Sequence, residues 1–297
     1  MTIRFGKYRV VPAKPRGFRR EFAMIERIEH DGIEGIRVGR LTSRINTTCI
    51  VYRVGSTVID TGPPNQWRNV RRFLDERAVR QVVVTHHHED HSGNLAPIRR
   101  SLQPEIYSPA AGISPLRDGF ALRAYQKVLW GRPDRIVAAI MPGEIAIGDG
   151  RTLRPLHSPG HSPDMTCYLE PQRGWLFTGD LFISQRTRYL RQDEDVQQHV
   201  ESLDQILSLD FETVLCSHRG VVPAGKQALR AKRDFLVSLC ERVRRLRDEG
   251  RNAAQITRSL LGREDLMSWL TGFHFSKRNL VRSCLEAVSG SSVDGPT

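Results

Sequence analysis

The sequence predicts an α/β protein in which two β-sheets pack face to face between outer helices, a four-layer α/β/β/α sandwich. Strand-like segments alternate with helix-like segments once in each half of the chain, which favours this layered class. The apolar run at residues 82–84 does not alternate with polar residues, as is typical of a strand buried on both faces. The 297 residues, 39% of them hydrophobic, suffice for one large core, or for one core and a small appendage.

The first half begins with four short segments of strand character separated by glycine-containing turns, and we expect an antiparallel meander from them. They cover residues 22–28, 35–41, 47–54 and 56–60. Gly62, Pro63 and Pro64 then turn the chain into a helix expected over residues 66–76. The buried strand at 82–84 follows, and a histidine-rich run comes directly after it.

The second half repeats this plan before the chain becomes helical. Strands are expected over residues 152–157, 165–169, 175–178 and 211–216, with a helix over 196–209. From about residue 226 the apolar spacing predicts a helix ending at Gly250, then helical segments over 253–261, 264–270 and 276–288. We therefore expect three parts: a basic N-terminal arm at 1–20, a catalytic domain at 21–222 and a helical C-terminal extension at 223–297.

The net charge of +12 is concentrated at the two ends of the chain. Residues 1–20 carry seven basic and no acidic side chains, and residues 223–283 carry fourteen basic and six acidic ones. Such ends can attract an anionic substrate or nucleic acid, although an arginine-rich solvated surface is the plainer interpretation. There is no membrane-length apolar stretch, and the five cysteines are scattered without Cys-x-x-Cys spacing. We therefore expect a cytoplasmic protein with no membrane partner.

The run from His86 to His91 has the spacing His-x-His-x-Asp-His on a turn that leaves a strand. Imidazole suits zinc, and an adjacent carboxylate suits a second metal, so the run predicts two neighbouring metal sites. A charged surface loop is the alternative. Three later metal-ligand residues at strand ends or turns weigh against it, namely His161, Asp180 and His218.

Together with Asp60, these residues resemble the five ordered motifs of the metallo-β-lactamase superfamily over roughly residues 20–222, which implies its four-layer sandwich. The resemblance implies that Asp60 orients ligands without binding metal. It also suggests that Asp90 guides a proton toward the leaving group. The implied ligands are His86, His88 and His161 for one metal, Asp90, His91 and His218 for the other, and Asp180 as the bridge.

This arrangement predicts a metallo-hydrolase that uses a metal-bound hydroxide at a dinuclear site. Two cations about 3.5 to 4 Å apart lower the pKa of a shared water from about 15.7 to near neutrality. The expected cofactors are two divalent ions, Zn²⁺ first, with Fe and Mn as alternatives because the same ligands accept them.

The loop after Asp180 lacks the glycine- and cysteine-bearing continuation typical of glyoxalase II. In this loop, Arg186 and Arg188 are candidates to bind a substrate carboxylate or phosphate, and Tyr189 is a candidate to stabilise an oxyanion. A solvent-exposed loop is the alternative. Residues 123–131 can cap the cleft as a lid, and packing alone explains them equally well.

The sequence is compatible with three functions. The leading hypothesis is hydrolysis of an ester, thioester or lactone of a small acidic metabolite or acyl carrier. The second is phosphodiester cleavage of RNA or DNA. The C-terminal extension resembles the helical domain of relatives of the β-lactamase-like endoribonuclease, and its basic charge favours nucleic acid, whereas its few aromatic residues do not. The third is a metal-binding sensor or pathway accessory with weak turnover. The expected partner is an anionic small molecule, with nucleic acid and a homodimer as open alternatives.

Overall fold

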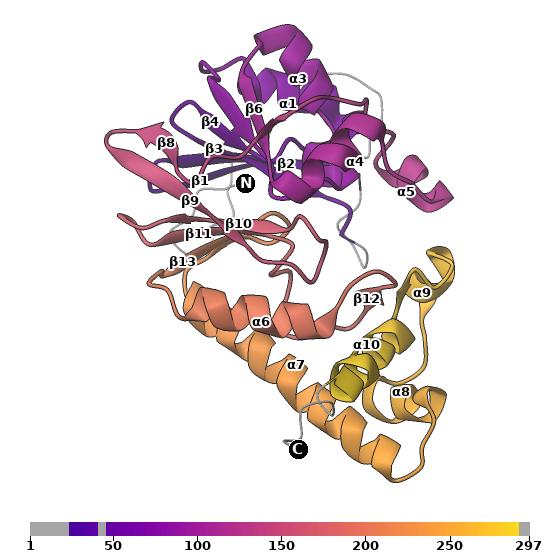
Figure 1. Cartoon of the computed structure of the whole chain (residues 1–297). Coiled ribbons are helices and arrows are strands. Elements are labelled where there is room, and N and C mark those ends of the chain that lie inside the picture. The colour runs from indigo at the N-terminus through magenta and orange to yellow at the C-terminus, as the bar shows by residue number, and fades with distance from the viewer. Residues whose placement is uncertain (1–23, 41–45, 291–297) are drawn as a thin grey trace, which may run out of the picture.

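The computed structural model describes residues 24–40 and 46–290, so the predicted basic arm lies outside the described residues. Two β-sheets pack against each other, and helices cover the outer face of each (Figure 1). The predicted α/β/β/α sandwich is therefore confirmed. Among the helices of the described ranges, none is long and apolar enough to cross a membrane.

The first sheet contains seven strands in chain order, β1 to β7. Strands β1 to β4 form the predicted antiparallel meander, and β4 to β7 run parallel. The parallel pairs need crossover connections, which contain α1 (Trp67–Leu74) and α3 (Leu95–Leu102). The strands are β1 (Met24–His30), β2 (Ile33–Gly39), β3 (Cys49–Val54), β4 (Thr57–Ile59), β5 (Gln81–Val83), β6 (Glu105–Ser108) and β7 (Ala139–Ile140).

The second sheet has six strands in the order β14-β13-β11-β10-β9-β8. Neighbours are antiparallel except β11 and β13, which are parallel and are joined through α6 (Val196–Leu207). This parallel pair brings the chain after β11 and the chain after β13 to the same edge. The strands are β8 (Ile145–Gly148), β9 (Arg151–His157), β10 (Thr166–Glu170), β11 (Trp175–Gly179), β13 (Thr213–Cys216) and β14 (Gly220–Val222).

Three apolar clusters hold the layers together. One lies between the sheets and includes Tyr52 from β3 and Phe177 from β11, whose rings meet edge to face at 5.5 Å. A second lies beneath α1 and α3, and a third joins the second sheet to α6 and the C-terminal helices. Since each sheet is apolar on both faces, each needs helices outside as well as its partner sheet inside.

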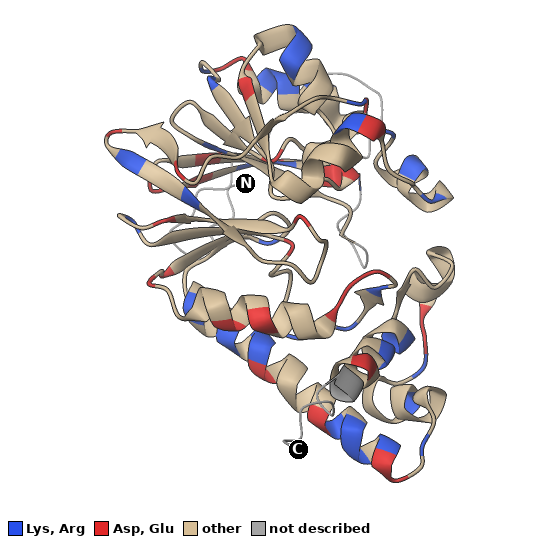
Figure 2. Cartoon of the chain, in the orientation of Figure 1, with Lys and Arg blue, Asp and Glu red and all other residues tan. Residues whose placement is uncertain are grey.

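The C-terminal helices pack on α6 and return to the main domain. They are α7 (Gly225–Asp248), α8 (Ala253–Leu261), α9 (Leu266–Leu270) and α10 (Lys277–Gly290). Before α10, β15 (Phe275–Ser276) pairs with β12 (Leu190–Arg191) in the segment that follows Asp180. Basic residues outnumber acidic ones along α7 (Figure 2), and part of this positive charge is neutralised because Arg233 contacts Asp204 and Asp234.

Several short elements carry no sequence signal that predicted them. β7, β12 and β15 have two residues each, which is too short for an alternating pattern. The helices η2 (Ala110–Gly112), α4 (Ile113–Asp118) and α5 (Ala124–Leu129) have at most six residues, fewer than two full turns. Of these, α5 lies within the segment proposed as a lid.

Candidate metal centre

The seven predicted metal ligands meet at one edge of the two sheets. The histidine-rich run follows β5 and continues into α2 (Glu89–Ser92), whereas His161 lies between β9 and β10. Asp180 follows β11, and His218 follows β13, the parallel neighbour of β11. All seven side chains are buried, and His86 and His91 are 0% exposed.

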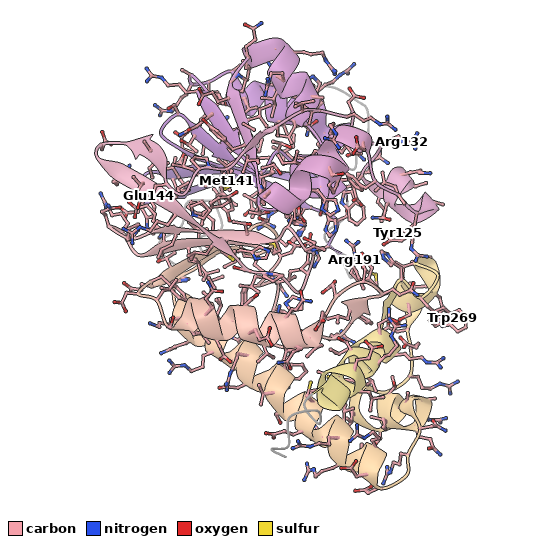
Figure 3. The ribbon with its side chains drawn as sticks, viewed as in Figure 1. Tyr125, Arg132, Met141, Glu144, Arg191 and Trp269 are labelled. Carbon is pink, nitrogen blue, oxygen red and sulfur yellow. The ribbon has the colours of Figure 1, made fainter. Side chains whose placement is uncertain are left out.

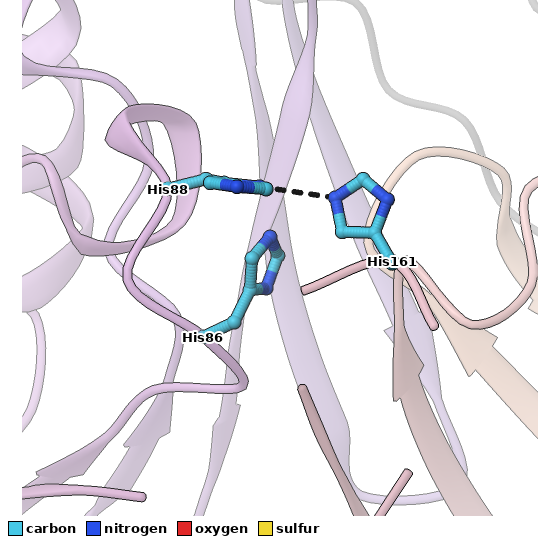
Figure 4. A group of neighbouring side chains, drawn as sticks. All are labelled: His86, His88 and His161. Carbon is cyan, nitrogen blue, oxygen red and sulfur yellow. Dashed lines mark hydrogen bonds between the residues drawn. The ribbon is translucent and has the colours of Figure 1, made fainter. Parts of the chain in front are cut away.

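The first group consists of His86, His88 and His161, whose potential ligand atoms all lie within 4.8 Å of one another. Figure 4 shows the three imidazoles converging, with His161 Nε2 at 3.0 Å from His88 Nδ1. Two aromatic nitrogens this close need either a shared proton or a cation between the rings.

The second group consists of Asp90, His91 and His218, again within 4.8 Å. Asp180 lies between the two groups. Its Oδ1 is 2.9 Å from His218 Nε2 and 3.3 Å from His91 Nε2, and its Oδ2 is 3.3 Å from His161 Nε2. A carboxylate that faces both groups occupies the position required of a bridging ligand, and the assignment of individual ligands remains a prediction.

Hydrogen bonds around the site leave the Nε2 atoms available to a metal. His218 Nδ1 donates to the Thr48 carbonyl at 2.6 Å, and His91 Nδ1 donates to Asp60 Oδ2 at 2.8 Å. In the neutral form of each ring, Nε2 therefore carries a lone pair. Among the described residues, His86 Nε2 and His91 Nε2 are buried without any hydrogen-bond partner. Buried polar atoms rarely stay unpaired, so this donor set fits two metal ions.

The carboxylate of Asp60 is hydrogen-bonded to residues from several parts of the chain around the site. Its backbone adopts φ 59°, a left-handed conformation that aspartate tolerates better than most residues. The carboxylate is fully buried and accepts hydrogen bonds from Thr85 N at 2.8 Å and from Ser217 Oγ at 3.0 Å, in addition to His91. It thus ties the histidine-rich turn to the chain after β13, and its role in orienting the ligands stays a prediction.

Glycines precede two of the predicted ligands where the backbone has no space for a side chain. At Gly160 (φ +129°) a Cβ would lie 2.6 Å from the backbone N of His199. At Gly179 (φ +47°) it would lie 2.8 Å from the Thr85 side chain. Gly160 allows the chain before His161 to approach α6, and Gly179 allows the chain before Asp180 to approach Thr85 at the start of the histidine-rich turn.

Burial and neighbouring charges shift the protonation of the site in two directions. Burial would lower the pKa of His91 and His218, but the acidic groups around these rings raise it, so a metal competes with protons for both. Burial lowers the pKa of His86 well below its usual value, so its imidazole is neutral. Burial alone would raise the pKa of Asp180, but His218 and His91 outweigh it and keep that pKa well below the ordinary range. Neutral imidazole and ionised carboxylate are the metal-binding forms.

The candidate substrate residues lie beyond the metal cluster. Tyr189 donates a hydrogen bond from its hydroxyl to Asp265, and Arg188 lies 3.8 Å from the same carboxylate. Arg186 is exposed to solvent. The structure thus places two of the three against the C-terminal segment, and their role in substrate binding stays a prediction.

Two residues that contact the predicted ligands, Glu194 and Arg191, were not predicted from the sequence. Glu194 is 3.4 Å from His161 Nδ1 and 3.2 Å from His199 Nε2, so it supports a predicted ligand from behind. Arg191 lies against His88. Both belong to a polar stretch after Asp180 without a metal-type motif, and only the path of the chain brings them to the centre.

Comparison with known proteins agrees with this geometry. The model of the metallo-beta-lactamase superfamily matches residues 43–218, more than half of the chain and all predicted ligands. The chain belongs to the metallo-beta-lactamase superfamily. The expectation of a metallo-β-lactamase-like enzyme is therefore confirmed at the level of the family. The likeness of the C-terminal extension to the endoribonuclease relatives stays a prediction.

Curated relatives of this superfamily member include the lactamase-like protein aptB of Emericella nidulans, 29% identical over 69% of this chain and 62% of that protein. An atrochrysone carboxyl ACP thioesterase of Paecilomyces divaricatus is 28% identical over 76% of this chain and 68% of that enzyme. The chain spans 42% and 50% of the length of two further atrochrysone carboxyl ACP thioesterases. These are similarities to parts of longer proteins.

A solved beta-lactamase domain protein of Burkholderia ambifaria has the same metallo-β-lactamase fold. It superposes with a TM-score of 0.68 at 19% identity, over 92% of this chain and 90% of that one. Because the superposition covers most of this chain, the shared fold extends beyond the residues that the family model matches.

Proposed function

We propose that this protein is a metal-dependent thioester hydrolase that releases an acyl group from an acyl carrier. The observation that carries this proposal is the pair of buried His/Asp groups that meet at Asp180, with two imidazole Nε2 atoms unpaired. The thioesterase names of several relatives support thioesters as the substrate class.

Two zinc ions are the proposed cofactors because imidazole-rich sites suit zinc. His86, His88 and His161 would hold one ion, and Asp90, His91 and His218 the other, with Asp180 between them. When bound, such a pair of ions lowers the pKa of a water molecule and polarises a carbonyl oxygen.

The chain's own residues supply orientation and proton transfer. Asp60 and the Thr48 carbonyl fix the proton on Nδ1 of His91 and His218, so neither ring can turn its lone pair away from the site. Asp90 Oδ2 lies 3.8 Å from both His91 Nε2 and His218 Nε2, at the edge of the second group. In this position it can hold a proton and pass it to the departing thiolate.

A substrate panel tests the proposal. Zinc-loaded protein is assayed with an acyl thioester on an acyl carrier protein, an N-acetylcysteamine thioester, a lactone and a bis-aryl phosphodiester. We expect thioester turnover that chelation abolishes and that Asp180→Ala loses. Phosphodiester turnover without thioester turnover would show that the protein is a phosphodiesterase and not a thioesterase. Full activity of the chelated protein would show that hydrolysis does not depend on a metal.

A further inference from the structure

Arg191 is a buried guanidinium beside the candidate metal centre. Its side chain is 10% exposed, and its backbone lies in β12, where it pairs with Phe275 of β15. Figure 3 shows Arg191 below Tyr125 of α5, toward the C-terminal helices. The C-terminal segment therefore holds the backbone that carries this charge.

The guanidinium is fixed in orientation by Asp193. Arg191 Nε and Nη2 donate to the two oxygens of Asp193 at 3.1 and 2.9 Å. Asp193 Oδ1 also lies 3.6 Å from His274 Nε2, and His274 Nδ1 is 2.6 Å from the hydroxyl of Tyr125. A bidentate pair supported in this way leaves one group, Nη1, free to act on the centre.

Arg191 Nη1 points at the ring of His88, 2.9 Å from Nε2 and 3.1 Å from Nδ1. A metal would take one of these nitrogens, and the other would then carry a proton. Since a guanidinium has no acceptor and a metal-bound, protonated imidazole has none either, His88 cannot accept from Nη1 in the loaded protein. The guanidinium keeps its pair with Asp193, but its buried Nη1 group then needs another acceptor, because buried donors rarely stay unpaired.

We propose that Arg191 is the anion-binding residue of this active site, whose Nη1 binds a carboxylate on the acyl group of the substrate next to His88. This inference rests on the proposed thioester hydrolysis and specifies which thioesters are preferred, namely those with an acidic acyl group. Charge-assisted pairing in a desolvated position is strong enough to select such substrates.

The carboxylate of Glu89 is an alternative to the substrate carboxylate as the acceptor for Arg191 Nη1. Glu89 is buried, its Oε1 accepts from Gln126 Nε2 at 2.8 Å, and its Oε2 is buried without a partner among the described residues. If Nη1 turned to Glu89 on metal loading, no external carboxylate would be needed, so binding of a free carboxylate decides between the two.

The first test measures binding without turnover. Zinc-loaded wild type and Arg191→Gln, checked for equal metal content, are titrated with succinate and with butyrate by calorimetry. Arg282→Gln is the matched control, because it removes an exposed arginine whose Nη2 bonds the Gln192 carbonyl next to Arg191. We expect succinate binding to weaken roughly 10- to 100-fold only in Arg191→Gln. Equal succinate binding by wild type and Arg191→Gln, or none by wild type, would overturn the proposal.

The second test uses two N-acetylcysteamine thioesters, succinyl and butyryl, which differ by a carboxylate in place of a methyl group. We expect Arg191→Gln to raise KM for the succinyl thioester by a similar factor relative to KM for the butyryl thioester, so that the preference for the acidic acyl group is lost. An equal fall in kcat for both would place the guanidinium on the reacting oxygen and refute the carboxylate site. If no thioester is turned over, the proposed function fails, while the succinate titration still tests Arg191.

Discussion

Replacing Asp60 with asparagine should weaken metal binding without removing a ligand. The carboxylate accepts from His91 Nδ1 at 2.8 Å, from Thr85 and from Ser217. An amide oxygen can keep the bond from Thr85 N, and the Ser217 hydroxyl can rotate to accept from the amide nitrogen. At His91, however, the amide N–H of Asp60→Asn faces the ring N–H, so the imidazole changes tautomer and its Nε2 gains the proton.

Metal binding must then return the proton of His91 from Nε2 to Nδ1, where the ring N–H faces the amide N–H of the new asparagine. Loss of such an outer hydrogen bond costs roughly 10- to 100-fold in metal affinity, or about 1.4 to 2.8 kcal/mol. The measurement is competition with a chromophoric chelator, which reports the zinc dissociation constants of wild type and Asp60→Asn.

Asp164→Asn is the matched control. Asp164 is also buried and contacts a ring through His87 Nδ1 at 2.8 Å, but His87 belongs to neither metal group. We expect Asp164→Asn to lower the melting temperature and leave zinc affinity within a factor of about three, which is about 0.7 kcal/mol. If Asp60→Asn binds zinc like wild type and loses only stability, the tautomer argument is wrong.

Three further outcomes follow from the same geometry. Gly160→Ala should lower both melting temperature and zinc affinity, because its Cβ meets a backbone atom at 2.6 Å, whereas Gly143→Ala, with nothing within 4 Å, should not. Chelation should lower the melting temperature, since zinc at 100 times its dissociation constant stabilises by about 2.7 kcal/mol; an unchanged value would mean that no ion binds the folded state preferentially. Burial lowers the pKa of Lys232 from its usual 10.5 to about 8, so between these pH values the unfolded chain binds the extra proton and rising pH favours the folded state. Denaturant titrations at several pH values in this window measure the free energy of unfolding. This free energy should rise with pH more steeply in wild type than in Lys232→Met, and an equal rise in both would contradict the lowered pKa of Lys232.

The sequence predicted the sandwich and the clustering of ligand types well. Strand-like segments broken by glycine-containing turns identified the meander, and an apolar run without alternation identified β5. Apolar periodicity identified the long helices, because helices of several turns carry enough repeats to be recognised. Ala253–Leu261 was expected as a helix and forms α8 with those bounds. Two-residue strands such as β12 carry no such repeat, and their existence depends on a partner strand far along the chain.

The metal chemistry could be predicted from the sequence, because histidines and aspartates spaced at strand ends restrict which ions and reactions are suited to the site. Which charged side chain faces that site depends on the tertiary structure. Arg186 and Arg188 were plausible from their nearness to Asp180, yet Arg188 contacts Asp265, and Arg191 lies on His88 instead. The reason is physical: the pairing of β12 with β15 and the bond to Asp193 set the direction of a flexible side chain, and both depend on the folded arrangement of distant segments.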